Sequence, residues 1–501
     1  MIRTGPQSRS ALSSGVVLAM LLTAGVHLAL GRVHNHVLGA DDDRLWLFFT
    51  GASLGRPAEA DAWQDRVAAS MRADGVAESD AMRIDLRRDY ARNYVAASVV
   101  YRGAAEAVQR LDPAIQRDYP RYVAVALPAG FIAAYALTSA LVLLAAWFCG
   151  SRRVAFAAGL AIVLSSFLEI AFDVAGDPIA GGPLLLPRAG ERVVAPIQSF
   201  STNTLAMIVN PGIAFTIFGD TPRNHFLLAA IAVFALRSAG RYRGAALLLL
   251  GLSFLHQSQT GLLFACLLAC DLLLRPHIFA EPAMKAITVL TLAVFLARES
   301  LAPYIGLQRP VAAMVIALVL ATTVALAAMR AAREPPARVA RLARRLHGGS
   351  DRWADVRVLF TLWAVTVVPV AIANAFVDST ESLYFWAQVH GRLLAILRSG
   401  LLLAVTIAAI HRAQAAERRD RAAVLVALAL LAAVPSAWRA ARAEPAPSTR
   451  LEHSLRAIDT RIGPTLDWDA IGRWREDEIY YALARALHRG EDAMVTIPPR
   501  E

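Results

Sequence analysis

The sequence lacks the motifs by which several large enzyme and transport classes are recognised. It has no Walker loop, no dinucleotide-binding glycine fingerprint and no cluster of zinc ligands, which argues against an ATP-driven pump and a redox enzyme. It also has no tandem repeat and no low-complexity tract. Its three cysteines, Cys149, Cys266 and Cys270, all lie in apolar runs, so we expect small core residues rather than a disulfide or a metal site.

Apolar residues, in contrast, make up 56% of the chain, and the mean hydropathy is +0.46. Several uncharged runs approach the roughly 20 residues that a helix needs to cross the hydrocarbon core of a bilayer. We therefore expect an all-α polytopic membrane protein. The net charge of +11 lies mostly in short segments between these runs, where membrane topology explains it better than nucleic-acid binding.

Hydropathy predicts about eleven transmembrane helices. The expected helices cover residues 11–30, 122–149, 154–172, 224–236, 244–255, 260–274, 286–297, 311–329, 358–377, 393–410 and 422–438. The first run follows Arg3 and Arg9, as a secretory signal would, but it is long for a signal, and no small-residue cleavage site precedes the charges that begin at Asp41. It is predicted to be a retained first helix.

The arginines between these helices predict the orientation of the chain. With a cytoplasmic N-terminus, every inner connection is basic, as the positive-inside rule requires. The longest inner connection is the basic stretch from Arg330 to Arg352. The location predicted is a bacterial inner membrane, with the C-terminus on the outer, periplasmic side.

One apolar segment, Leu205–Gly219, does not fit a simple crossing. It is short, and Asn210, Pro211 and Gly212 interrupt it. A full crossing here would also invert every later connection, so we expect a re-entrant or interfacial helix on the outer side.

The predicted domain organisation is one membrane domain, 1–440, and a small outer C-terminal tail, 441–501. The membrane domain carries a first outer loop, 32–121, and a second outer loop, 173–223, with the re-entrant segment. Apolar residues recur at helical spacing between Ser79 and Leu111, which predicts amphipathic helices on the outer membrane surface. The tail is expected to be polar and helical.

An acidic run follows the first helix. Three consecutive carboxylates, Asp41, Asp42 and Asp43, repel one another unless a cation, a metal ion or water compensates them. One interpretation is a solvated loop that terminates the helix. The other is a carboxylate placed just above the membrane as a general base or metal ligand.

The segment Asp42–Phe49, followed by Leu54 and Gly55, resembles the start of the first outer loop in GT-C superfamily glycosyltransferases. These polytopic enzymes take a sugar from a polyprenyl-phosphate carrier on the outer side of the membrane. The family pattern is an acidic pair shortly after the first helix, then an apolar stretch and amphipathic helices. Asp42 and Asp43 match the pair best, with Asp41 as a one-residue alternative, whereas Arg44 and the short tail depart from the common pattern.

The resemblance implies a mechanism in which Asp42 deprotonates an acceptor hydroxyl of an envelope glycan or lipid as this oxygen attacks the anomeric carbon of the sugar. The lipid phosphate leaves already charged, so it needs cationic stabilisation more than a general acid. Asp43 would orient the acceptor or hold a divalent metal such as Mg²⁺; no other cofactor is implied.

Other candidate substrate-binding residues share the predicted outer side. They are His34, His36, Arg223, His225, His256, Gln257, His390 and Arg392. Arg223 precedes a predicted helix and is either a phosphate ligand or an interfacial anchor. His256 and Gln257 belong to a polar tight turn that would line a cavity or simply join two helices. His390 and Arg392 follow aromatics that fit an interfacial belt or a sugar.

Two other function classes remain open. One is a polysaccharide polymerase or ligase, which would concentrate its arginines in two large outer loops. The other is a transporter of a lipid-linked or anionic substrate, which would have internal repeats and charges buried near the midplane. A non-catalytic scaffold is a third reading.

Overall fold

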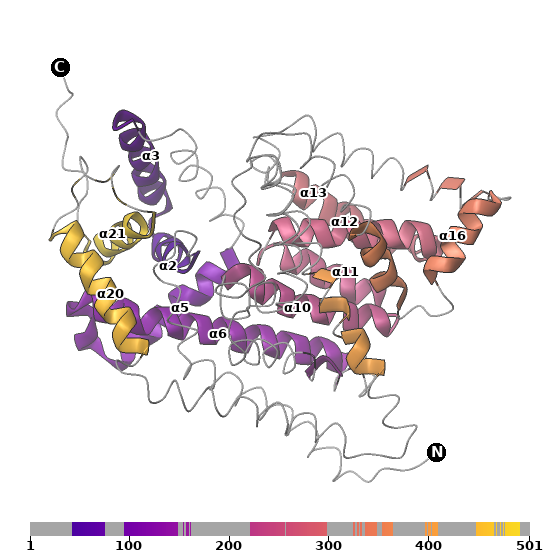
Figure 1. The fold of residues 1–501 in the computed structure, drawn as a ribbon, viewed down its shortest axis with the longest axis horizontal. Coiled ribbons are helices and arrows are strands. Elements are labelled where there is room, and N and C mark those ends of the chain that lie inside the picture. The colour runs from indigo at the N-terminus through magenta and orange to yellow at the C-terminus, as the bar shows by residue number, and fades with distance from the viewer. Residues whose placement is uncertain are drawn as a thin grey trace, which may run out of the picture. The chain divides into compact units, whose positions relative to one another are not determined.

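The computed structural model describes eleven α-helices and two 3-10 helices with defined bounds and a further helical stretch over residues 353–363, and every regular element among the residues it describes is helical (Figure 1). The all-α prediction is therefore confirmed for that part of the chain. The described residues are 43–75, 95–148, 154, 157–159, 161, 221–255, 257–297, 324–325, 328–329, 331–332, 336–347, 353–363, 396–397, 399–401, 403–408, 447–464, 467, 471, 474 and 476–490.

Five predicted spans coincide with described helices. Residues 122–149 correspond to α6 (Tyr119–Phe148), 224–236 to α10 (Thr221–Ser238), 244–255 to α11 (Tyr242–Leu252), 260–274 to α12 (Gln257–Leu274) and 286–297 to α13 (Pro282–Ala297). Parts of the spans 154–172, 311–329, 358–377 and 393–410 are described and are helical there. The spans 11–30 and 422–438, and the segment Leu205–Gly219, lie outside the described residues.

Helix α6 contains the segment Tyr119–Val142, the one described segment that is long and apolar enough by itself to cross a membrane. The apolar helices α11, α12 and α13 are shorter. Helix α6 leaves several large apolar side chains exposed, which is unfavourable against water but suits contact with lipid. They are Val125, Ile132, Leu137 and Leu144. The full count of about eleven crossings stays a prediction.

The contacts divide the chain into two compact units. Unit 1 comprises residues 1–26, 138–217 and 223–436, and unit 2 comprises 27–137, 218–222 and 437–501. The first outer loop is thus grouped with the C-terminal tail, and not with the rest of the predicted membrane domain.

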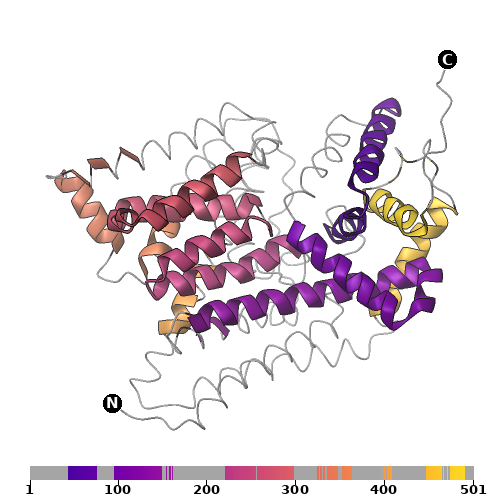
Figure 2. The same ribbon diagram turned by 180° about the vertical axis from the view of Figure 1, so that it is seen from behind.

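Unit 1 contains the apolar helices α10 to α13, the 3-10 turn η2 (Pro276–Ala280) and the basic helix α16 (Ala337–His347). α11 packs against α12 and α13, and α12 packs against α16 (Figure 2). Gly240, with φ 72°, reverses the chain between α10 and α11, and the Arg241 N–H donates to the Leu236 carbonyl at 2.8 Å. This glycine-ended helix cap places Arg237, in the last turn of α10, close to Tyr242 at the start of α11.

Unit 2 is built from both ends of the chain. Its first part contains α2 (Asp43–Ser53), α3 (Pro57–Ala73), α5 (Val95–Leu111), η1 (Pro113–Arg117) and the beginning of α6. Its second part contains α20 (Pro447–Ile462) and α21 (Glu476–Arg489), so the tail is helical as predicted. α2 packs against both α5 and α21.

The apolar face of α5 is covered by protein. Tyr101 is 0% exposed, and Ala97 and Ser98 are each 1% exposed. Gly51 of α2 lets the two backbones approach, because a Cβ there would lie 2.9 Å from the Ser98 carbonyl oxygen. The amphipathic pattern of α5 therefore reflects packing on α2, and the location of this segment on the outer membrane surface stays a prediction.

Candidate functional site

A cavity of about 190 Å³ opens within unit 2, between α2, α5, the start of α6 and α21. Its walls are Phe48, Ala52, Tyr101, Arg102, Ala105, Glu106, Gln109, Tyr122, Ala484, Leu487 and His488. This volume is far larger than a single water needs and smaller than the cavities that hold drug-sized molecules. It suits one small polar molecule or one unit of a longer chain.

The α5 wall follows directly from helical spacing. Tyr101, Ala105 and Gln109 are four residues apart, so their side chains lie on one face, and Arg102 and Glu106 form the adjoining row. Arg102 Nε donates to Glu106 Oε1 at 2.8 Å, and both side chains are 43% exposed. One side of the cavity thus presents a solvated ion pair to an incoming ligand.

Aromatic rings form the opposite wall. The rings of Tyr122 and His488 are stacked, with centroids 4.9 Å apart and planes inclined by 25°. Phe48 meets Tyr122 edge-on at 5.8 Å. Gln109 Nε2 donates to the Tyr122 hydroxyl oxygen at 3.0 Å, which joins the α5 wall to the aromatic wall.

His488 is half-buried, and desolvation lowers its pKa below the ordinary value; the Arg489 charge acts in the same direction, and a hydrogen bond that the imidazole donates to the backbone of Gln116 acts against it. The imidazole is therefore neutral at pH 7. A neutral imidazole has one nitrogen that donates and one that accepts, so it suits a hydroxyl group better than an anion.

A second set of contacts holds α21 in place behind the cavity. Tyr119 packs against Tyr481 and His488, with ring centroids 5.2 Å away in both pairs. The Tyr481 hydroxyl donates to Asp459 Oδ1 at 3.1 Å, and the buried Arg485 donates to the same oxygen at 2.7 Å. Burial and the Asp459 charge raise the pKa of Tyr481, so it remains a donor. Asp459 of α20 thereby fixes α21, which carries His488.

The predicted acidic run meets this unit at the start of α2. Asp43 is the first residue of α2, and Phe48 and Ala52 of the same helix line the cavity. Because an α-helix rises 1.5 Å per residue, Asp43 and Phe48 are separated by about 7.5 Å along the axis. Asp41, Asp42, His34 and His36 lie outside the described residues, as do His390 and Arg392.

Two helix starts differ from the sequence prediction. Arg223 and His225 lie within the first turns of α10, which begins at Thr221, so Arg223 does not precede the helix. Gln257 begins α12, so the polar residues after His256 are a first helical turn and not a tight turn. His256 itself is outside the described residues. The buried Thr260 hydroxyl donates to the Leu252 carbonyl at 3.0 Å, and this hydrogen bond links α12 to α11.

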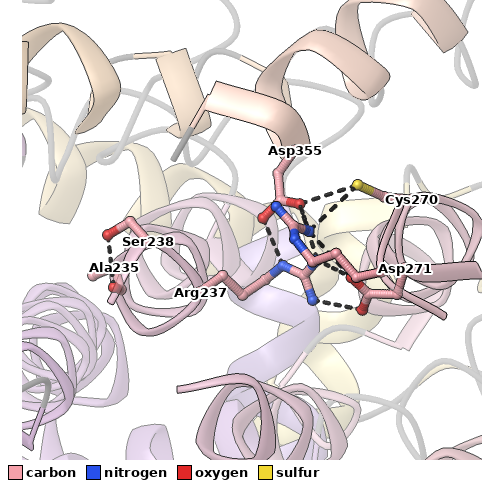
Figure 3. A network of polar contacts seen from close by, with 7 residues as sticks. Ala235, Arg237, Ser238, Cys270, Asp271 and Asp355 are labelled. Carbon is pink, nitrogen blue, oxygen red and sulfur yellow. Dashed lines mark hydrogen bonds and ion pairs between the residues drawn. The ribbon is translucent and has the colours of Figure 1, made fainter. Parts of the chain in front are cut away.

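Unit 1 contains a different polar cluster, which the sequence did not predict (Figure 3). Arg237 donates to both oxygens of Asp271, at 2.5 and 2.8 Å, and to both oxygens of Asp355, at 2.6 and 2.9 Å. Arg275 donates to Asp355 at 2.8 Å and to Asp271 at 3.2 Å. Each of the four residues is at most 5% exposed.

This cluster, Arg237–Asp271–Arg275–Asp355, is electrically balanced and internally satisfied. The Tyr242 ring lies 5.3 and 5.2 Å from the two guanidinium carbons, and Cys270 Sγ donates to Asp355 at 3.1 Å. Cys270, Asp271 and Asp355 place ligand atoms within 4.8 Å of one another, as a metal site would. Two guanidinium groups already occupy the carboxylate oxygens, however, so the donor set does not fit a metal ion. The cluster ties helix ends together.

The comparisons with family models, curated proteins and solved structures find no match for this chain. The candidate site therefore depends on geometry alone.

Most cavity residues could not be identified from the sequence. No local pattern distinguishes Tyr101, Gln109 and Tyr122, and His488 reaches them only because α21 packs against α2. One usable signal was present: Ile479, Tyr480, Leu483 and Leu487 recur at helical spacing in the tail, which indicates a buried face. The spacing does not reveal which surface covers that face.

Proposed function

We propose that the chain is a GT-C-like glycosyltransferase that moves a sugar from a polyprenyl-phosphate donor to an envelope glycan or lipid acceptor at the outer face of the inner membrane. The observation that carries the proposal is that α2 begins at Asp43 and then lines, through Phe48 and Ala52, a polar and aromatic cavity. Asp43, the last residue of the acidic run, and two residues of the cavity wall thus belong to one helix.

The cavity has the chemistry that a sugar unit requires. Sugars combine apolar ring faces with many hydroxyl groups, and the walls offer aromatic faces at Phe48 and Tyr122. Gln109 and the neutral His488 supply hydrogen-bonding groups that do not require a charged ligand. We assign this cavity to the acceptor, whose hydroxyl must be brought to the acidic end of α2.

In the proposed reaction the acceptor oxygen forms a bond to the anomeric carbon, and the bond from that carbon to the phosphate oxygen breaks. The hydroxyl proton passes to Asp42, and the bonding electrons leave with the lipid phosphate. Arg223, in the first turn of α10, is the proposed cation for this phosphate, since a helix start also favours an anion.

The location of Asp43 also supports a plain structural role. Carboxylates at a helix N-terminus interact favourably with the helix dipole, by about 0.3–1 kcal/mol each. A capping role predicts a small loss of stability on neutralisation and no loss of chemistry. Catalysis predicts a large loss of product formation and little loss of stability.

The buried charges of unit 1 are the observation that would favour a transporter. Arg237 and Asp271 lie in the last turns of α10 and α12, however, Arg275 directly follows α12, and both carboxylates of the cluster are paired with guanidinium groups. Charges that serve transport are expected near the midplane, facing a pathway. The cluster therefore does not favour a transporter.

The test compares Asp42→Asn, Asp43→Asn and the triple Asn variant at 41, 42 and 43 with Asp65→Asn in α3 as the matched control. Cells producing each variant at equal levels are analysed for envelope glycans and lipid-linked sugars. We expect Asp42→Asn to lower product formation about 100- to 10,000-fold, the typical contribution of a general base. The control should keep full activity.

The melting temperature of each purified variant separates catalysis from capping. Catalysis predicts a lost product with a nearly unchanged melting temperature. If the triple variant makes normal product, the acidic run is only a solvated helix start and the transferase proposal is wrong.

A further inference from the structure

We propose that α16 is an interfacial helix that binds anionic phospholipid headgroups through four arginines, Arg338, Arg341, Arg344 and Arg345. The inference is independent of the proposed transferase activity. It identifies a second contact between this chain and the membrane, at the helix ends where the basic connections lie.

The two faces of α16 differ sharply. Val339 and Ala343, four residues apart, are 7% and 3% exposed and pack on protein. The four arginines are all exposed, and the helix sequence ARVARLARRLH contains no acidic residue. Leu342, 38% exposed, is a large apolar side chain among them. A basic helix with an exposed apolar residue is typical of helices that lie in a membrane interface.

The positive charge of α16 is uncompensated within the part of the chain that the structure describes. None of the four arginines forms an ion pair with a described residue. In contrast, Arg243, also an exposed arginine of unit 1, pairs with Glu281. Four clustered guanidinium groups repel one another, so an anionic surface stabilises them.

Contacts within unit 1 locate α16 at the C-terminal end of α12. Helix α16 packs on α12, and Arg357 Nη1 donates to the last carbonyls of α16, at His347 (2.6 Å) and Leu346 (3.4 Å). Two residues before Arg357, Asp355 accepts a hydrogen bond from Arg275, which directly follows α12. In Figures 1 and 2, α16 accordingly runs across the end of α12.

This geometry gives α16 the orientation of an in-plane helix. If α12 crosses the bilayer, as its sequence predicts, a helix lying across its end is at the level of the headgroups. The basic stretch Arg330–Arg352 is predicted to be cytoplasmic, and anionic lipids give that leaflet a negative surface potential. Guanidinium groups bind phosphate oxygens in pairs, which makes arginine well suited to headgroups.

The experiment places a nitroxide label at position 342 of the full chain in lipid nanodiscs. Cys149, Cys266 and Cys270 are replaced by alanine, and Leu342→Cys carries the label. Its accessibility to oxygen, which is enriched in lipid, is compared with its accessibility to a water-soluble nickel chelate. Discs of phosphatidylcholine alone are compared with discs that contain phosphatidylglycerol.

We expect the label to shift from the aqueous to the lipid-accessible state when the anionic lipid is present, and to return when salt is raised. Replacing all four arginines by glutamine should abolish the shift, because each basic residue near an anionic surface strengthens binding roughly five-fold. Replacing them by lysine should preserve most of it. The matched control, glutamine at the exposed Arg56, Arg72, Arg110 and Arg117 of unit 2, should behave as the parent protein.

Two outcomes overturn the proposal. One is a label that stays aqueous in phosphatidylglycerol discs, or that is equally buried in both lipids. The other is a label that ignores phosphatidylglycerol but responds to an added RNA oligonucleotide, which would make α16 a nucleic-acid surface. The salt and lipid dependence of the parent protein decides the matter even if the glutamine variant does not fold.

Discussion

Tyr122 and His488 stack with their ring centroids 4.9 Å apart, although they lie far apart in the chain. Their contact brings helix α6, the candidate membrane span, and the C-terminal helix α21 to one cavity wall. The last described helix of the chain is thus part of the candidate site, and its loss would remove a wall and not merely an appendage.

Replacing His488 by alanine should lower the proposed transferase activity about 10- to 100-fold, an order of magnitude typical of losing one to two hydrogen-bonding or stacking contacts of roughly 1.4 kcal/mol each. Because we propose that the acceptor binds at this wall, the larger part of the effect should be a raised KM for the acceptor. Arg489→Ala, next to it but exposed, is the control. Equal activity of the two variants would exclude His488 from the site.

Acid should destabilise the protein through His488. Burial lowers the pKa of His488 in the folded state, so between that pKa and about 6.5 the unfolded chain binds a proton that the folded chain does not. The His488 contribution is therefore present above pH 6.5 and is lost as the pH falls. We expect the melting temperature to drop between pH 7.5 and 5.5, and to drop less in His488→Gln. An equal drop in both proteins would contradict this account.

Periodicity and hydropathy predict the positions of helices well here, because both depend on which side chains of a segment are buried and which face water. The predicted spans 122–149 and 260–274 begin within three residues of α6 and α12 and end within one residue of them. The helical tail was predicted for the same reason. The re-entrant segment Leu205–Gly219 and the number of crossings stay predictions.

Long-range pairing was not predictable from one sequence. Arg237, Asp271 and Asp355 each look like an ordinary charge at the edge of an apolar run, and only folding joins them. The acidic run Asp41–Asp43 can be recognised from the sequence because its three carboxylates are adjacent in the chain. The pairing of Tyr122 with His488 cannot be recognised, because these residues become neighbours only when the C-terminal helix packs on the first part of unit 2.

Gly130 should be intolerant of any side chain. A Cβ at this position of α6 would lie 2.6 Å from Cδ1 of Tyr101, whose buried ring lines the cavity. Gly130→Ala should therefore destabilise the protein by about 1–3 kcal/mol, as overpacking does, and should reduce activity by displacing Tyr101.

The matched control is Gly103→Ala on α5, where a Cβ has no neighbour within 4 Å. It should stabilise the protein by about 0.5–1 kcal/mol because alanine favours a helix over glycine. Both effects are read as shifts in melting temperature in detergent. Two similar shifts would mean that α5 and α6 do not approach at Gly130.

Breaking the buried cluster of unit 1 should be far more costly than breaking an exposed ion pair. Asp355→Ala leaves Arg237 and Arg275 buried with one carboxylate between them, and we expect a loss of about 3–5 kcal/mol. Arg243→Ala breaks the exposed pair with Glu281 and should cost at most about 1 kcal/mol. Thermal unfolding of both variants in the same detergent makes the comparison, and equal losses would contradict a structural role for the cluster.

The packing of α21 on α2 requires the first outer loop and the C-terminal tail to share one side of the membrane, whichever side that is. The positive-inside rule adds that this side is the outer one and that α16 faces the cytoplasm. Single cysteines at the exposed positions Arg110, His453 and Arg341, each in a chain without native cysteines, test both statements. In intact cells a membrane-impermeant maleimide that passes the outer envelope should label positions 110 and 453, and should label 341 only after the inner membrane is permeabilised. Labelling of 110 and 453 from opposite sides would contradict the packing of unit 2, whereas labelling of 341 alone in intact cells would keep unit 2 but reverse the orientation and remove the basis for an outer-face transferase.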